Sequence, residues 1–144
     1  MKCTLRNQRG QSLVGLALVL PILLVIVLGV MTFGIAINTK IAVSTAAREA
    51  ARNYAVFQDP SQARQKAYDS LRQALPVSST EFNQNFNPAS DVAISVSGGY
   101  VTVTVTYHQP VYVPGLLTML GGSRVGDSSG RLNLSSTAIF RLEQ

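Results

Sequence analysis

SLVGLALVLPILLVIVLGVMTFGIAINT, residues 12–39, decides the fold, because this stretch contains no Asp, Glu, Lys, Arg or His. Its apolar core, about 25 residues from Leu13 to Ile37, exceeds the roughly 20 that a helix needs to cross a bilayer. Lipid offers the backbone no hydrogen-bond partners, so the segment must be helical. The alternative is a buried helix of a soluble protein. The rest of the 144-residue chain is too small to wrap such a helix on every face, so we predict a transmembrane helix.

The charges on either side of this helix predict its orientation. Three basic residues and no acidic one lie in the short segment before it: Lys2, Arg6 and Arg9. Those that follow are farther out and are accompanied by Glu49: Lys40, Arg48 and Arg52. By the positive-inside rule, we expect the N-terminus in the cytoplasm and everything after Thr39 outside.

The composition of the chain after Thr39 argues against nucleic-acid binding, metal binding and catalysis. The formal charge is +5, from 12 Lys and Arg against 7 Asp and Glu, but without the three leader residues only nine basic residues remain. This balance does not indicate nucleic-acid binding, which needs a clustered basic face. The one cysteine is Cys3 and the one histidine is His108, so we expect no disulfide, metal site or cofactor. No nucleophile or phosphate-binding motif occurs, and we predict that the protein is not an enzyme.

Helical periodicity continues after the membrane segment. Apolar residues recur every three or four positions at Ile41, Ala42, Ala46, Ala50, Tyr54 and Phe57. We therefore expect a rod of about 45 residues, roughly 65 Å long. Asp59 and Pro60 suit the N-cap and first position of a second helix, with a stripe of Ala63, Ala67, Leu71 and Ala74. Pro76 ends this helix, and residues 77–90 are predicted to form a loop.

Alternating residues then predict β-structure. Valines alternate with serines and threonines over residues 91–107, and Gly98-Gly99 is a two-residue hairpin turn. Residues 132–142 form a third strand. We expect the valine face to pack on the helices, the threonines to face outward, and Phe82 and Phe86 to cover the core edge rather than form an adhesive surface. The predicted architecture is α+β: a long N-terminal helix, a short second helix and a small antiparallel sheet.

Two sets of residues are candidate contacts. Within the membrane helix, Gly15, Gly29 and Gly34 would let another helix approach closely, and Pro21 is expected to bend the helix near Ala17. Outside it, the candidates are the charged residues Arg48, Glu49 and Arg52 and an apolar patch with Leu116, Leu117 and Met119. The alternatives are a solvated helix face, with Glu49 and Arg52 as an i,i+3 pair, and a short helix folded onto its own core.

Three stretches resemble one family. They are RGQSLVGLALVLP (residues 9–21, with Phe33-Gly34 further on), STAAREAARNYAV (44–56) and SSTAIFRLE (135–143). They are similar to the TadE/TadG-like pseudopilins of tight-adherence (Tad) pilus systems. The resemblance implies a leader, residues 1–10, which a prepilin peptidase removes between Gly10 and Gln11. It further implies a membrane helix (11–39), a stalk (40–58) and an extracytoplasmic domain (59–144).

The resemblance also implies partners and a location. These are the inner membrane, other pseudopilins, the major pilin and the assembly platform, with surface adhesion as the outcome. Gly15 and Leu16 stand where pilins of this broad class carry a glutamate and an aromatic residue. The missing carboxylate removes a costly buried charge together with its pairing to the mature N-terminal amine. Two alternatives stay open: an unprocessed, membrane-anchored binding module, and a secreted adhesin cut near Ala36.

Overall fold

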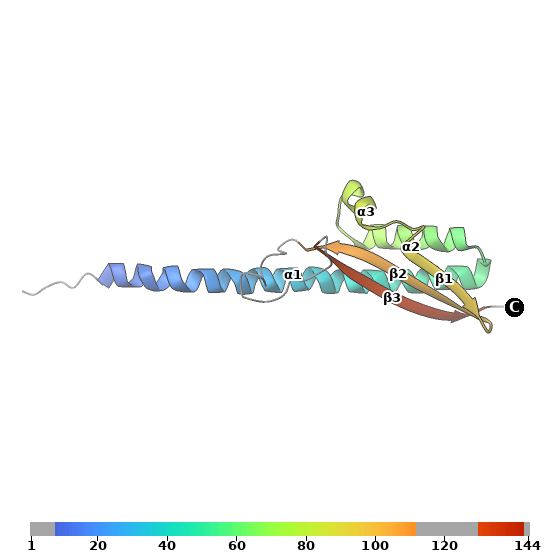
Figure 1. Cartoon of the computed structure of the whole chain (residues 1–144), viewed down its shortest axis with the longest axis horizontal. Coiled ribbons are helices and arrows are strands. Elements are labelled where there is room, and N and C mark those ends of the chain that lie inside the picture. The colour runs from blue at the N-terminus through green and yellow to red at the C-terminus, as the bar shows by residue number, and fades with distance from the viewer. Residues whose placement is uncertain (1–7, 112–129, 143–144) are drawn as a thin grey trace, which may run out of the picture.

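The computed structural model describes residues 8–111 and 130–142 of the chain. In chain order its elements are α1 (Gln8–Phe57), α2 (Pro60–Ala74), α3 (Ser79–Asn85), β1 (Val92–Ser97), β2 (Tyr100–Pro110) and β3 (Arg131–Arg141). The N-terminal half of α1 projects alone, and all other elements gather around its C-terminal half (Figure 1). We call this second part the head (residues 40–111 and 130–142). The predicted α+β, pilin-like arrangement is confirmed.

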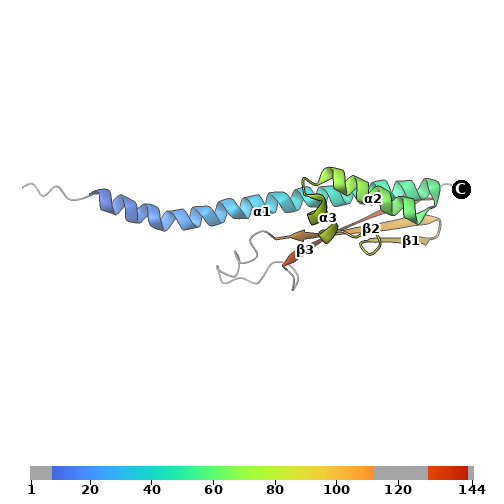
Figure 2. The ribbon, with the colours of Figure 1, turned by 90° about the horizontal axis from the view of Figure 1, so that it is seen from above.

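Helix α1 is one continuous element of 50 residues, about 75 Å long at 1.5 Å per residue. It continues through Pro21 and curves gently when seen from above (Figure 2). It ends at Phe57, and Gln58 follows with a φ of 53°. This left-handed residue reverses the chain, so α2 runs back along α1. The predicted rod of about 45 residues is thus slightly longer.

Helix α2 begins as its sequence predicts. Asp59 is the N-cap and accepts a 2.8 Å hydrogen bond from the Ser61 backbone amide, while Pro60 occupies the first helical position. Hydrogen bonds from the Ser61 side chain, the Ser61 amide and the Gln62 side chain lower the pKa of Asp59 from its ordinary 3.8. The Asp59 carboxylate therefore stays ionised to lower pH than an ordinary aspartate and continues to cap the start of α2.

Alanines form the centre of the head. Eight described residues of α1 are 0–5% exposed, and six of them are alanine: Thr39, Ala42, Val43, Ala46, Ala47, Ala50, Ala51 and Ala55. Helix α2 contributes Ala63, Ala67 and Leu71, all fully buried. These short side chains let α1 contact α2 along one side and strands β2 and β3 along another (Figure 1 and Figure 2). The predicted apolar face of this helix was wrong at two positions, because Ile41 and Phe57 are each 61% exposed.

The sheet is antiparallel with strand order β1-β2-β3. Gly98 and Gly99 have φ values of 59° and 79°, as a two-residue hairpin turn requires, and they set the register that pairs Val96 with Val101. Val101, Val103 and Val105 of β2 are fully buried against the helices. The threonines between them face outward, as predicted. The central strand ends at Pro110, where a missing amide costs the sheet little.

Residues 79–85 correct the prediction of a loop. They form α3, whose N-cap Ser78 accepts a hydrogen bond from the Glu81 amide. The helix brings Phe82 into an aromatic cluster between α2, α3 and β2, made of Tyr68, Phe82, Phe86 and Tyr107. Phe82 and Phe86 are 0% and 3% exposed, so they lie inside the core and not at its edge.

Candidate membrane and filament interface

The N-terminal half of α1 is an uncovered apolar surface. We call residues 13–37 the bare half. Its leucines, isoleucines, valines and phenylalanine are 41–70% exposed, apart from the half-buried Val25 and Leu28, and no other element packs on most of its length (Figure 1). Within the described residues, one helix is long and apolar enough to cross a membrane, and it contains this surface. An exposed apolar surface of this extent is typical of a membrane or protein interaction site, and it is consistent with single-pass membrane anchoring.

The small residues of the bare half have open space around them. A Cβ placed on Gly15, Gly29 or Gly34 would meet no atom within 4 Å. Nothing inside the chain therefore requires glycine at these positions. Their use as close-approach points for another helix stays a prediction about partners.

The predicted processing site lies in the first turn of α1. The backbone is already helical from Gln8, so Gly10 and Gln11 are part of the helix and lie three and two residues before the bare half. Cleavage between them stays a prediction.

A buried polar contact joins the helix to the head just above the bare half. The Thr39 hydroxyl donates a 2.7 Å hydrogen bond to Gln109 Oε1, and the two residues are 1% and 7% exposed. A pocket of about 320 Å³ opens beside them, lined by Gly34, Ile35, Asn38, Thr39, Leu75, Pro76, Val77, Tyr107 and Gln109. The sequence prediction did not single out Gln109. It continues the alternation of Val101 to Tyr107, and this phase is the signal that could have found it.

The charged candidates lie on the side of α1 that the head leaves uncovered. Arg48 and Arg52 are exposed. Glu49 does not serve as an i,i+3 partner of Arg52, because its carboxylate lies 3.9 Å from Lys66 Nζ of α2. A groove of about 430 Å³ runs between α1 and α2 here, lined by Glu49, Arg52, Asn53, Val56, Phe57 and Lys66.

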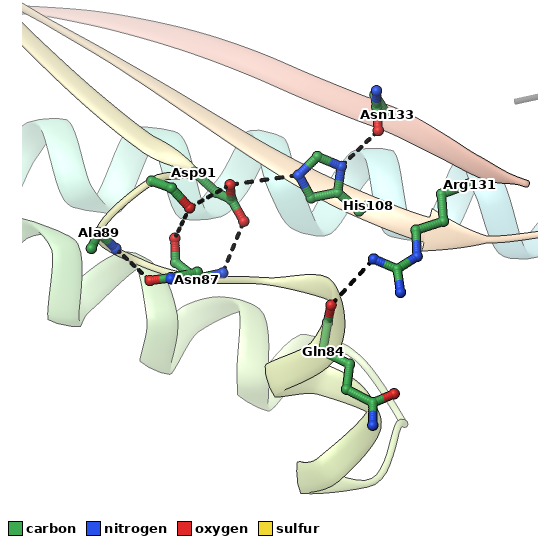
Figure 3. Close-up of polar contacts among 8 residues, drawn as sticks. Gln84, Asn87, Ala89, Asp91, His108, Arg131 and Asn133 are labelled. Carbon is green, nitrogen blue, oxygen red and sulfur yellow. Dashed lines mark hydrogen bonds and ion pairs between the residues drawn. The ribbon is translucent and has the colours of Figure 1, made fainter. Parts of the chain in front are cut away.

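A second polar cluster lies where β1 begins and β2 ends (Figure 3). His108 Nε2 is 3.5 Å from Asp91 Oδ1, and its Nδ1 is 2.7 Å from Asn133 Oδ1 of β3. Asp91 Oδ2 also accepts a 2.8 Å hydrogen bond from the Asn87 backbone N–H. These contacts connect strands β2 and β3 to the loop before β1, which is the geometry of a structural cluster.

Two further kinds of candidate remain, metal ligands and the predicted apolar contacts. Among the described residues, no group of three His, Cys, Asp or Glu side chains could hold a metal ion. The predicted contacts Leu116, Leu117 and Met119 lie outside the described residues.

Comparison with known proteins finds a family match for the N-terminal part of the chain. Residues 10–52 match the family described as TadE-like protein. Comparisons with curated proteins and with solved structures gave no significant match. The matched region begins at the predicted processing site and covers the bare half and most of the α1 segment that is buried in the head. The chain therefore carries a TadE-like domain at its N-terminus, consistent with a component of a Tad pilus system.

Proposed function

We propose that the chain is a minor pilin (pseudopilin) that takes part in the assembly of a Tad-type pilus and so in surface adhesion. The observation that carries the proposal is the division of one 50-residue helix into an exposed apolar half and a half that packs against the other elements of the head. A protein of this form can be stored in a membrane and then moved into a bundle of similar helices without refolding. Both environments cover the same apolar surface.

The proposed course begins in the bacterial inner membrane, with the N-terminus inside and the head outside. A prepilin peptidase removes residues 1–10 after Gly10. The assembly platform then brings the bare half beside the helices of the major pilin and other pseudopilins, while the head faces outward. The protein contributes packing surfaces to this process and no bond-making chemistry.

The two alternatives differ in what happens to the N-terminus. An anchored binding module would keep residues 1–10. A secreted adhesin cut near Ala36 would lose the whole bare half. The position of Ala36 speaks against that cut, because the helix is continuous through it and its neighbours Gly34 and Ile35 line the pocket against the head.

Replacing Gly10 by leucine tests the proposal. Prepilin peptidases act at a glycine, so we expect G10L to keep its leader, to stay in the membrane and to be absent from sheared surface material. Intact mass of both fractions measures this. The matched control is G29L, where an added Cβ meets nothing within 4 Å, and its leader should still be removed. Unchanged trimming and pilus assembly in G10L would contradict the proposal.

A further inference from the structure

One stripe of α1 remains uncovered along the whole head. Its residues recur at helical spacing, and those whose side chains are exposed include Ile41, Thr45, Arg48, Arg52 and Val56. Steps of three and four residues keep them on one face of the helix. The same spacing carries the face back through Ile37 and Gly34 into the bare half. We call the part from Ile41 to Val56 the α1 stripe. A partner helix that lies along the bare half therefore continues along the α1 stripe.

The charge of the α1 stripe is positive and uncompensated. In the part of the chain that the structure describes, neither Arg48 nor Arg52 has an ion-pair partner. The one acidic residue of α1 is Glu49, and it is engaged with Lys66. Lys40 is also engaged, because its ammonium group donates to the Ser135 carbonyl oxygen. Two free guanidinium groups thus lie on the face that a partner helix would contact.

The groove between α1 and α2 borders this face at Arg52. It holds a further polar atom without a partner: Asn53 Oδ1 is buried and accepts no hydrogen bond. Exposed Val56 and Phe57 provide the apolar part of its lining. The groove thus offers the Arg52 cation and apolar surface to a side chain from a neighbouring helix.

We propose that the α1 stripe docks a helix of a different pilin-like subunit that carries acidic side chains at the height of Arg48 and Arg52. This inference rests on the proposed function, because it names the kind of neighbour that the chain meets during pilus assembly. A second copy is the poorer occupant. When two copies pack in parallel and in register, Arg48 and Arg52 of one copy face Arg48 and Arg52 of the other. These like charges repel each other across the interface. Helix α1 of a staggered copy offers only Glu49, which already has a partner.

A charge-reversed copy of the chain provides a probe of known composition. The full chain and its R48E/R52E variant are labelled with a donor and an acceptor and reconstituted together in phosphatidylcholine bilayers. Energy transfer then measures pairing. We expect the mixed pair to associate on the order of five-fold more strongly than either chain with itself, and the excess to fall in high salt. Self-association of the unaltered chain that equals or exceeds mixed pairing would overturn the inference in favour of a second copy.

A control variant changes charge elsewhere. S95E/S97E/R141E alters the net charge by the same amount on the outer face of the sheet, and it should pair with the unaltered chain no better than a second copy does.

If R48E/R52E does not insert, R48Q/R52Q replaces it. Loss of repulsion should then make the self-association of that variant exceed the self-association of the unaltered chain, and equal values would overturn the inference. Resistance to carbonate extraction is measured first, so a failure of membrane anchoring, which would contradict the proposed function, is distinguished from a failure of charge-directed pairing.

Discussion

Replacing Phe82 by alanine is expected to lower the free energy of unfolding of the head by about 3–5 kcal/mol. Phe82 is fully buried, and its ring centroid lies 5.2 Å from that of Tyr68, 5.6 Å from Phe86 and 6.0 Å from Tyr107. The Arg72 guanidinium carbon lies 5.8 Å from the same centroid. Truncation removes apolar burial and leaves a cavity that α2, α3 and β2 cannot all close.

Urea titration of the full chain in detergent micelles measures this effect. The chain has no tryptophan, so the fluorescence of the tyrosines reports the transition. The matched control is Phe57→Ala at the end of α1, where the side chain is 61% exposed and we expect a change within about 0.5 kcal/mol. Equal losses in the two variants would mean that the aromatic cluster does not hold the head together.

Placing two aspartates in the bare half is expected to abolish stable membrane integration. Leu24 and Val27 lie near its middle and are 49% and 48% exposed. Each acidic residue at the centre of a membrane helix costs about 2.5–3.5 kcal/mol, so the double variant L24D/V27D loses roughly 5–7 kcal/mol of insertion free energy. Aspartate is too short to reach the lipid headgroups from there.

Carbonate extraction of membranes from producing cells checks this result. L24D/V27D should move to the soluble or aggregated fraction, while L24A/V27A, which changes the same side chains without adding charge, should remain integrated. Full integration of L24D/V27D would contradict the account, because the bare half would then not be held by the lipid interior.

Local pattern was sufficient to predict most of the fold. An apolar run of about 25 residues can bury itself only in lipid or in a helix bundle, so residues 12–39 had to be a helix. The alternating valines and the Gly98-Gly99 turn determine β1, β2 and their register, because a slip by one residue would expose every valine.

The errors occur where tertiary contacts outweigh local composition. Residues 79–85 are mostly polar and include Ser79, Asn83 and Asn85, which favour loops. They nevertheless form a helix, because the aromatic cluster buries Phe82. A sequence signal was present: Ser78 and Glu81 have the spacing of a capping box. Ile41 and Phe57 fit an apolar period, but each is 61% exposed, so neither α2 nor the sheet covers it.

The sequence predicts only part of the candidate membrane and filament interface. The exposure of Arg48 and Arg52 follows from the spacing of the alanines between them. The pairing of Glu49 with Lys66 depends on how α2 packs against α1, and the Thr39–Gln109 contact joins residues that are 70 positions apart. No local pattern reports contacts of this kind.

The mature N-terminus tests the central claim most directly. Protein from membranes and from sheared surface material is analysed by intact mass and N-terminal sequencing. The account predicts a chain that begins at Gln11 and is present in the sheared fraction. A chain that begins at Met1 and is confined to membranes would contradict pilin-type processing and leave an anchored binding module.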